Sequence, residues 1–173
     1  IIPRNTVAEL IRVSGELERD LSFNVGDNQI SFSNDDFEMV SRIVDGVYPD
    51  YKKIIPEKFI SRVLVNKDEL DKTIRIAGLF STNISDIKIN CSEGKMAVLA
   101  KNSDKGEIEI LVDASLKNQP FEVSLNFHYL LDGLKILDTE KVVIEFTGQG
   151  SPLVIRPNDD RKDVVYLIMP LRN

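Results

Sequence analysis

The hydrophobic and polar positions along this chain predict three amphipathic helices at regular spacing. Each expected helix begins at a residue that favours the N-cap position: Thr6, Asn66 and Asn126 lie 60 residues apart. Thr6 and Asn66 are each followed three residues later by glutamate, which makes a capping box, whereas Asn126 lacks the box. The leucine four residues after each cap should therefore share one register in the three helices: Leu10, Leu70 and Leu130.

Alternating apolar and polar positions predict strands around these helices, with turn residues between them. After the helices we expect strands at 21–25, 29–33, 37–44, 86–91, 95–100, 107–112, 142–147, 153–156 and 164–169, and before the later two helices at 59–65 and 121–125. The repeated unit is thus strand–helix–strand–strand–strand. Short connections favour antiparallel pairing, and an amphipathic helix covers one face of a sheet. We predict an α+β fold with two units in each domain.

A turn-rich stretch from Val44 to Tyr51 separates the first repeat from the other two. Because two repeats would complete a domain, we predict half a domain over residues 1–53 and a complete domain over residues 54–173. The chain opens on Ile1-Ile2-Pro3-Arg4, so we expect it to be part of a longer protein.

Composition narrows the classes of function. The chain has 173 residues, of which 42% are hydrophobic and 29% charged, as in a globular protein. Its net charge of -6 argues against a protein that grips nucleic acid with its whole surface. No apolar run reaches the length of a membrane span. Cys91 is the only cysteine, which excludes an intrachain disulfide and favours a reducing compartment.

No enzyme motif emerges from the candidate chemistry. His128 is the only histidine, which argues against most metal sites and against Ser/His or Cys/His catalysis. The pairs Asp35-Asp36 and Asp159-Asp160 fall in expected loops without a neighbour that would tune their pKa. The turn 148–150 lacks the lysine and the helix of a phosphate-binding loop. We expect no metal, no cofactor and no catalytic residue.

Two surfaces leave alternatives open. The expected helices carry basic residues that belong either to ordinary solvated faces or to one locally basic surface: Arg12, Lys67, Lys72, Arg75 and Lys135. The apolar C-terminal segment, which ends Pro170-Leu171-Arg172-Asn173, either docks as a simple strand or forms the rim of an apolar groove.

Four segments resemble the bacterial DNA polymerase III beta subunit family, the sliding clamps. They are residues 1–4, 44–51, 126–132 and 165–172, in the order and spacing of that family. The resemblance covers essentially the whole chain. It implies the DNA-clamp fold, with the second half of the middle domain followed by the last domain, and a non-catalytic subunit of the polymerase holoenzyme.

The resemblance also implies a function. Two complete subunits would form a head-to-tail homodimer ring around double-stranded DNA, independent of sequence, and act as a processivity factor in the bacterial cytoplasm, at the nucleoid and not at a membrane. An acidic exterior around a mildly basic lumen is compatible with the net charge. Arg4 matches a family position near DNA, and the other candidates to face DNA are Arg12, Lys72, Arg75 and Lys135.

Members of this family bind polymerases, the clamp loader and repair proteins through a short linear motif that enters an apolar pocket between the middle and last domains. The matching positions here are Pro49, Lys53, Ile54, Ile84, Asn126, Tyr129, Gly150, Pro152, Leu167, Ile168, Met169, Pro170 and Arg172. Leu79 and Phe80 match an apolar pair at the subunit interface. The alternative is a non-enzymatic α+β scaffold or adaptor without a nucleic-acid role, for which the 60-residue repeat alone would be equally good support.

Overall fold

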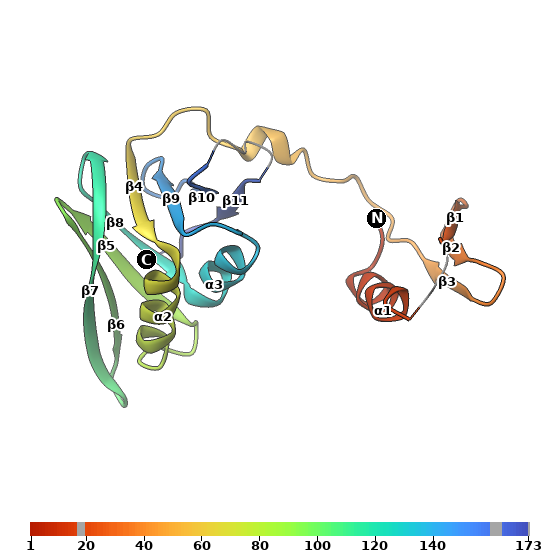
Figure 1. Cartoon of the computed structure of the whole chain (residues 1–173), viewed down its shortest axis with the longest axis horizontal. Helices are drawn as coiled ribbons and strands as arrows, with labels where there is room; N and C mark the ends of the chain where they lie inside the picture. Colours follow the sequence, from red (N-terminus) through yellow and green to blue (C-terminus); the bar gives the residue numbers. More distant parts are fainter. Residues whose placement is uncertain (17–19, 160–163, 173) are drawn as a thin grey trace. The chain divides into compact units, whose positions relative to one another are not determined.

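The computed structural model describes residues 1–16, 20–159 and 164–172. It divides into two compact units, Ile1–Asp50 and Tyr51–Asn173, which we call the first and the second unit (Figure 1). The described elements are helices and antiparallel strands, so the α+β class predicted from the sequence is confirmed.

The described residues of the first unit form one helix and a three-stranded antiparallel sheet. Its elements are α1 (Arg4–Ser14), β1 (Ser22–Val25), β2 (Gln29–Ser33) and β3 (Glu38–Arg42), with the sheet order β1-β2-β3. The side chains of Ile30 and Phe32 on β2 are buried. Their cross-strand partners on β1, Val25 and Phe23, are 66% and 68% exposed, so the apolar face of this sheet is covered only in part.

The predicted cap at Thr6 is wrong. Helix α1 begins at Arg4 with Pro3 as its N-cap, and no side chain caps it. Proline has a fixed φ and no N–H, which suits a helix start. The Thr6 hydroxyl instead lies 2.6 Å from the Ser41 hydroxyl on β3. Leu10 therefore lies seven residues after the cap and is partly exposed.

The other two caps are confirmed. The Asn66 Oδ1 accepts a hydrogen bond from the Glu69 N–H at 3.0 Å, and the Asn126 Oδ1 accepts one from the His128 N–H at 3.0 Å. Leu70 and Leu130, four residues after these caps, are both fully buried. The 60-residue register therefore relates the second and third helices and does not extend to the first.

In residues 51–159 and 164–172, the second unit has two α-helices, a short 3-10 helix and one eight-stranded sheet. Its elements are η1 (Tyr51–Ile54), β4 (Ser61–Asn66), α2 (Lys67–Gly78), β5 (Asp86–Ser92), β6 (Lys95–Asn102), β7 (Gly106–Asn118), β8 (Phe121–Asn126), α3 (Phe127–Lys135), β9 (Lys141–Phe146), β10 (Leu153–Pro157) and β11 (Tyr166–Ile168). The sheet order is β11-β10-β9-β4-β7-β6-β5-β8, and every pairing is antiparallel.

The two repeats of the second unit exchange strands. The strand before each helix pairs with the strand after the other helix, so β4 pairs with β9 and β8 pairs with β5. Strand β7 is longer than the predicted 107–112: its first part pairs with β6 and its last part, from Ala114 to Asn118, pairs with β4. The alternation of inward and outward residues continues through this extension, in which Ala114 is buried and Ser115 exposed.

The core of the second unit lies between the helices and the sheet. Figure 1 shows α2 and α3 on one face of the sheet, and their buried residues include Leu70, Ile74, Leu130 and Leu134. Cys91 is a fully buried free thiol in this core, and burial raises its pKa to about 12. It is a small hydrophobe here and not a nucleophile.

Candidate functional site

Asn126 ties three segments together where β8 meets α3. Its Nδ2 donates a hydrogen bond to the Ile84 carbonyl at 3.0 Å, while its Oδ1 caps the helix. The next residue, Phe127, donates its N–H to the Ser85 carbonyl at 2.9 Å. Ser85 has a φ of 59°, an uncommon conformation for a residue with a side chain. The loop before β5 is therefore fixed against the start of α3.

Asp86 holds the other end of this loop. Its Oδ1 accepts hydrogen bonds from the Thr82 N–H at 3.0 Å and from the Thr82 hydroxyl at 2.5 Å. Burial raises the pKa of Asp86, but the hydrogen bonds from the Thr82 hydroxyl and from the Thr82 and Asp86 N–H groups lower it by more. The result is a carboxylate whose pKa lies below its usual value and which keeps the loop closed.

The C-terminal segment reaches the same junction from the opposite edge of the sheet. Strand β11 pairs with β10, and after Pro170 the Leu171 N–H donates to the Ser124 carbonyl of β8 at 2.9 Å. Because β11 and β8 are the two edge strands of the sheet, this bond links the chain after one edge strand to the other edge strand. Leu171 was not among the predicted site residues, and only its position between Pro170 and Arg172 could have suggested it.

Three of the predicted site residues present exposed apolar side chains from segments bonded at this junction. Ile84, Tyr129 and Met169 are 60%, 58% and 61% exposed. They come from the loop before β5, from α3 and from the segment after β11. Large apolar side chains at this exposure in neighbouring segments are typical of a surface that binds a partner. We call Ile84, Asn126, Tyr129 and Met169 the junction surface.

The remaining predicted site residues lie around or away from the junction surface. In the β9–β10 hairpin, Gly150 has a φ of 73° and the Pro152 carbonyl accepts a hydrogen bond from the Thr147 hydroxyl at 2.8 Å. The Gln149 side chain of this hairpin donates to the Glu122 carbonyl of β8 at 3.1 Å. Ile168 is 2% exposed, so its side chain belongs to the core.

The other six predicted site residues are spread over both units. Lys53 and Ile54 lie in η1, and Ile54 is 56% exposed. Leu167 is partly exposed on β11, Pro170 and Arg172 follow that strand, and Pro49 belongs to the first unit.

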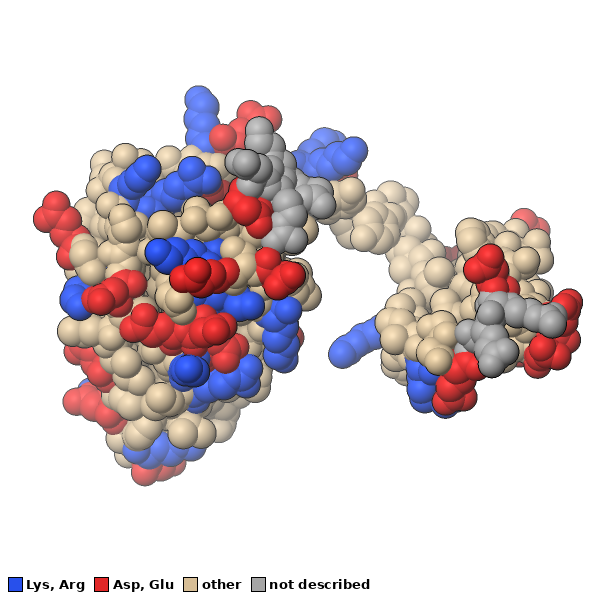
Figure 2. Space-filling model, viewed as in Figure 1, with Lys and Arg blue, Asp and Glu red and all other residues tan. Residues whose placement is uncertain are grey.

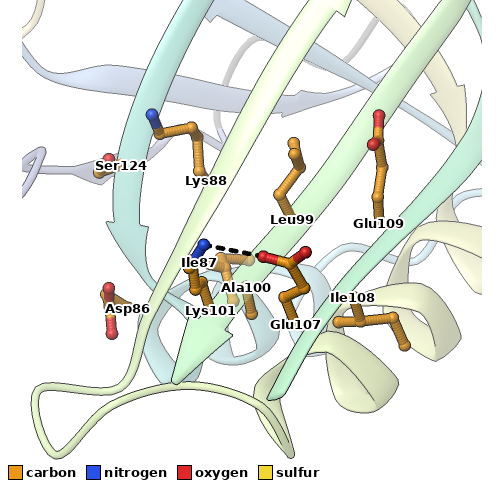
Figure 3. Close-up of a pocket in the computed structure, with 10 residues that line it drawn as sticks. All are labelled: Asp86, Ile87, Lys88, Leu99, Ala100, Lys101, Glu107, Ile108, Glu109 and Ser124. Atoms are coloured by element: carbon orange, nitrogen blue, oxygen red, sulfur yellow. Dashed lines mark ion pairs between the residues drawn. The ribbon is translucent and has the colours of Figure 1, made fainter. Parts of the chain in front are cut away.

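A hollow on the described surface lies outside the junction surface. It has a volume of about 500 Å³ and lies over β5, β6 and β7, with Ser124 at its rim (Figure 3). None of the predicted site residues lines it. Lys101 and Glu107 form an ion pair across it, with a 2.9 Å distance between Lys101 Nζ and Glu107 Oε2. Both side chains are mostly exposed, so this hollow is the charged solvent face of the sheet.

Most of the basic residues expected to face DNA are paired with carboxylates on their own helix. Arg12 contacts Glu9 with 2.5 Å between Nη2 and Oε1, and Arg75 contacts Asp71 with 2.6 Å between Nε and Oδ2. The hydrogen bond that each arginine donates to its carboxylate raises the pKa of the arginine.

Lys135 likewise contacts Asp132 at 3.0 Å, whereas Arg4 and Lys72 are exposed and form no ion pair with a described residue. Helix α2 carries three basic and three acidic residues, so it has no net charge. Figure 2 shows basic and acidic side chains interspersed on the visible face of the second unit.

The two residues predicted to lie at the subunit interface differ in their solvent exposure. Leu79, which follows α2, is 67% exposed, and Ile76 on the same helix is 46% exposed. Phe80 is partly buried and packs against the core. Only Leu79 of the predicted pair is therefore largely available to a partner.

Neither a membrane-spanning helix nor a metal-binding cluster is present among the described residues. Across residues 1–16, 20–159 and 164–172, no helix is both long and apolar enough to cross a membrane. In the same ranges, no group of three or more His, Cys, Asp or Glu side chains could hold a metal ion. Asp160, the second residue of the pair Asp159-Asp160 noted in the sequence, lies outside the described residues.

Comparisons with known proteins identify the family. The model of the DNA polymerase III beta subunit, C-terminal domain, matches residues 52–172, and that of the central domain matches residues 1–50. The beta sliding clamps of Proteus mirabilis and Vibrio cholerae are 30% and 26% identical over 99% of this chain and 47% of their own length. The chain thus spans about half the length of these curated relatives.

Solved structures agree with this assignment. A DNA polymerase sliding clamp from Pseudomonas aeruginosa, crystallised with a ligand, has a TM-score of 0.89 and 26% identity over all of this chain and 47% of its own. A sliding clamp from Bartonella birtlesii bound to griselimycin has a TM-score of 0.89 and 28% identity over the same shares. The chain has the DNA-clamp fold and belongs to the DNA polymerase III beta subunit family, whose members are non-catalytic polymerase subunits.

Proposed function

We propose that this chain is the partner-binding part of a sliding clamp, with half of the middle domain over residues 1–53 and the last domain over residues 54–173. In the complete protein, a homodimer ring encircles duplex DNA in the bacterial cytoplasm and tethers polymerase, clamp loader and repair proteins. The observation that carries the proposal is the junction surface, where three exposed apolar side chains come from segments that hydrogen bonds join near Asn126. Membership of the clamp family supports the ring.

The junction surface has the chemistry for binding a short peptide. Ile84, Tyr129 and Met169 offer apolar area that a peptide side chain would remove from water, at roughly 25 cal/mol per Å². The Tyr129 hydroxyl and Arg172, three residues after Met169, offer hydrogen bonds that orient the peptide. Asn126 offers the N–H and the lone pair that its two internal bonds leave over. The residues proposed to complete the pocket are Pro49, Lys53, Ile54, Gly150, Pro152, Leu167, Ile168 and Pro170.

A titration with griselimycin tests the peptide site, because a relative of this chain was crystallised with that compound. We expect saturable binding that weakens by about tenfold in Tyr129→Ala and in Met169→Ala, the loss typical of a strong contact residue. Leu111→Ala is the matched control, because Leu111 is 59% exposed but lies on β7 outside the junction surface. Lack of saturable binding, or an equal loss in Leu111→Ala, would overturn the proposal.

The charge on the helices is compatible with a ring that holds DNA by encirclement. Topological retention requires little phosphate affinity, and weak phosphate contacts permit sliding. Within the part of the chain that the structure describes, Arg4 and Lys72 are exposed without an ion pair, whereas Arg12, Arg75 and Lys135 each pair with a carboxylate. We propose that all five face the duplex and that Arg4 and Lys72 make the stronger contacts.

Encirclement is tested with the complete polypeptide that carries this chain. After loading onto nicked circular DNA, the protein should stay bound through a high-salt wash and leave once the DNA is linearised. Ordinary phosphate binding would be lost in the salt wash and would not respond to linearisation. Failure to remain on circular DNA would favour an adaptor without a nucleic-acid role.

The subunit interface is proposed to include Leu79 and Phe80. Leu79→Asp places a charge on the exposed member of this pair and should weaken the homodimer of the complete polypeptide in sedimentation experiments. Phe80 packs against the core, so its substitution should also lower stability. An unchanged dimer in Leu79→Asp would show that the interface lies elsewhere.

A further inference from the structure

Helix α3 and strand β11 approach each other at a point that leaves no room for a side chain. A Cβ atom added at Gly133 would lie 2.5 Å from Cδ1 and 2.6 Å from Cε1 of Tyr166. Non-bonded carbon atoms prefer about 3.5–4.0 Å. The Tyr166 ring therefore rests directly against the backbone of α3.

Glycine at this position carries a cost that local structure does not explain. Within a helix, glycine is less favourable than alanine by about 1 kcal/mol. Gly133 is in the interior of α3 and is not a cap, since the C-cap is Ile136. The close contact with Tyr166 explains its presence, because alanine could not occupy this position without a movement of α3 or β11.

Each of the two elements in contact leads to a residue of the junction surface. Tyr129 lies four residues before Gly133 on α3, so it is on the same side of the helix. Met169 lies three residues after Tyr166, directly beyond the end of β11. The pKa of Tyr166 is raised by burial and by the neighbouring charges of Asp132 and Tyr129, in line with a ring held against this part of α3.

We propose that the contact between Gly133 and Tyr166 is a positioning device, which sets the separation between α3 and β11 and so between Tyr129 and Met169. This inference rests on the proposed peptide function. Ile168, two residues after Tyr166, is anchored in the core and pairs with Leu153, which limits how far β11 can yield. A single added methyl group at Gly133 should widen the separation and misplace Met169 relative to Tyr129.

The test is Gly133→Ala in the whole chain, followed by two measurements. The first uses ¹³C-methyl methionine NMR, because the chain has three methionines, Met39, Met96 and Met169. We expect the Met169 signal to shift and the Met39 signal, which comes from the first unit, to stay in place. The second is griselimycin binding, which should weaken by about tenfold.

Two further variants separate positioning from general destabilisation. Val98→Ala removes a fully buried side chain on β6 and should lower stability while leaving the affinity for griselimycin unchanged. Tyr166→Leu removes the ring that the new methyl group would meet. In the Tyr166→Leu background, Gly133→Ala should therefore cause no further loss of affinity.

The outcomes distinguish this inference from the function on which it rests. If the unmodified chain does not bind griselimycin, the proposed function and the role of this contact in recognition are both overturned. Equal affinity of the unmodified chain and Gly133→Ala, or a Met169 signal that does not shift, overturns the positioning role alone. The positioning role is also overturned if Gly133→Ala still weakens griselimycin binding by the same factor in the Tyr166→Leu background. In that background the Tyr166 ring is absent, so the added methyl group has no ring to displace.

Discussion

Replacement of Asn126 by alanine should disturb both the fold and the junction surface. The side chain performs two tasks, since Oδ1 caps α3 through the His128 N–H and Nδ2 holds the loop through the Ile84 carbonyl, each at 3.0 Å. Asn66 is its counterpart 60 residues earlier and caps α2 through the Glu69 N–H at 3.0 Å. The two asparagines therefore form a natural pair of test and control.

The expected magnitudes follow from these contacts. Loss of an asparagine N-cap costs about 1 kcal/mol, which is the whole effect expected for Asn66→Ala. Asn126→Ala also loses the bond to Ile84, which adds about 0.5–1 kcal/mol because the site is partly open to water. The extra loss corresponds to a melting temperature lower by about 2–4 °C in a unit of this size. Asn126→Ala should therefore be the less stable variant.

Thermal unfolding of the whole chain, followed by far-UV circular dichroism, compares the two variants. Griselimycin affinity should fall in Asn126→Ala, because Ile84 loses its tether, and stay unchanged in Asn66→Ala. Asn126→Asp keeps a capping oxygen but loses the Nδ2 donor, so it should retain much of the stability and still bind poorly. If Asn66→Ala and Asn126→Ala prove equal in stability and in affinity, the tether to Ile84 has no role.

Three further predictions concern groups inside the units. Cys91, with a pKa of about 12, should be inert to thiol reagents at pH 8 until the chain unfolds, and prompt reaction of the native protein would contradict its burial. The pKa of the Asp86 carboxyl group is lowered in the folded state, so Asp86 stabilises the fold above its unfolded pKa of about 3.9. This stabilisation is lost as the pH falls through the lower pKa of the folded state. In urea titrations, the unmodified chain should therefore be more stable than Asp86→Asn at neutral pH but not at low pH. Leu130→Ala should cost about 3–4 kcal/mol, because Leu130 is fully buried, and Leu10→Ala much less, because Leu10 is partly exposed; equal losses in chemical denaturation would contradict the shifted register of α1.

Local signals in the sequence predicted the order of the α-helices and strands in the second unit, but not the full length of β7. The caps at Asn66 and Asn126 are confirmed because an N-cap bond joins residues two or three positions apart. The same reasoning failed at Thr6, where a capping box is present in the sequence but Pro3 begins the helix and the hydroxyl lies beside Ser41, 35 residues away. A contact across that distance along the chain has no local signature.

The candidate site was predicted from the resemblance to the sliding clamps and not from the hydrophobic pattern of the chain. Periodicity places Tyr129 on a helix and Met169 at the end of a strand over 164–169, but nothing in either segment shows that the two lie in neighbouring segments. The bonds from Asn126 to Ile84 and from Leu171 to Ser124 join segments 42 and 47 residues apart and create that neighbourhood. Gly133 carries no sequence signal at all, because a glycine near the middle of a predicted helix is seen only as a weakness.

The sequence by itself determined the repeated strand–helix–strand–strand–strand unit, the antiparallel α+β class and two of the three helix starts. These features depend on alternation, amphipathic period and capping, which act over a few residues. Only the tertiary structure decided that β4 pairs with β9 and β8 with β5, that β7 extends to pair with β4, and that the chain after β11 reaches β8. Such pairings depend on which strand edges and apolar faces meet after the chain has folded, and distant segments carry no record of each other in their own patterns.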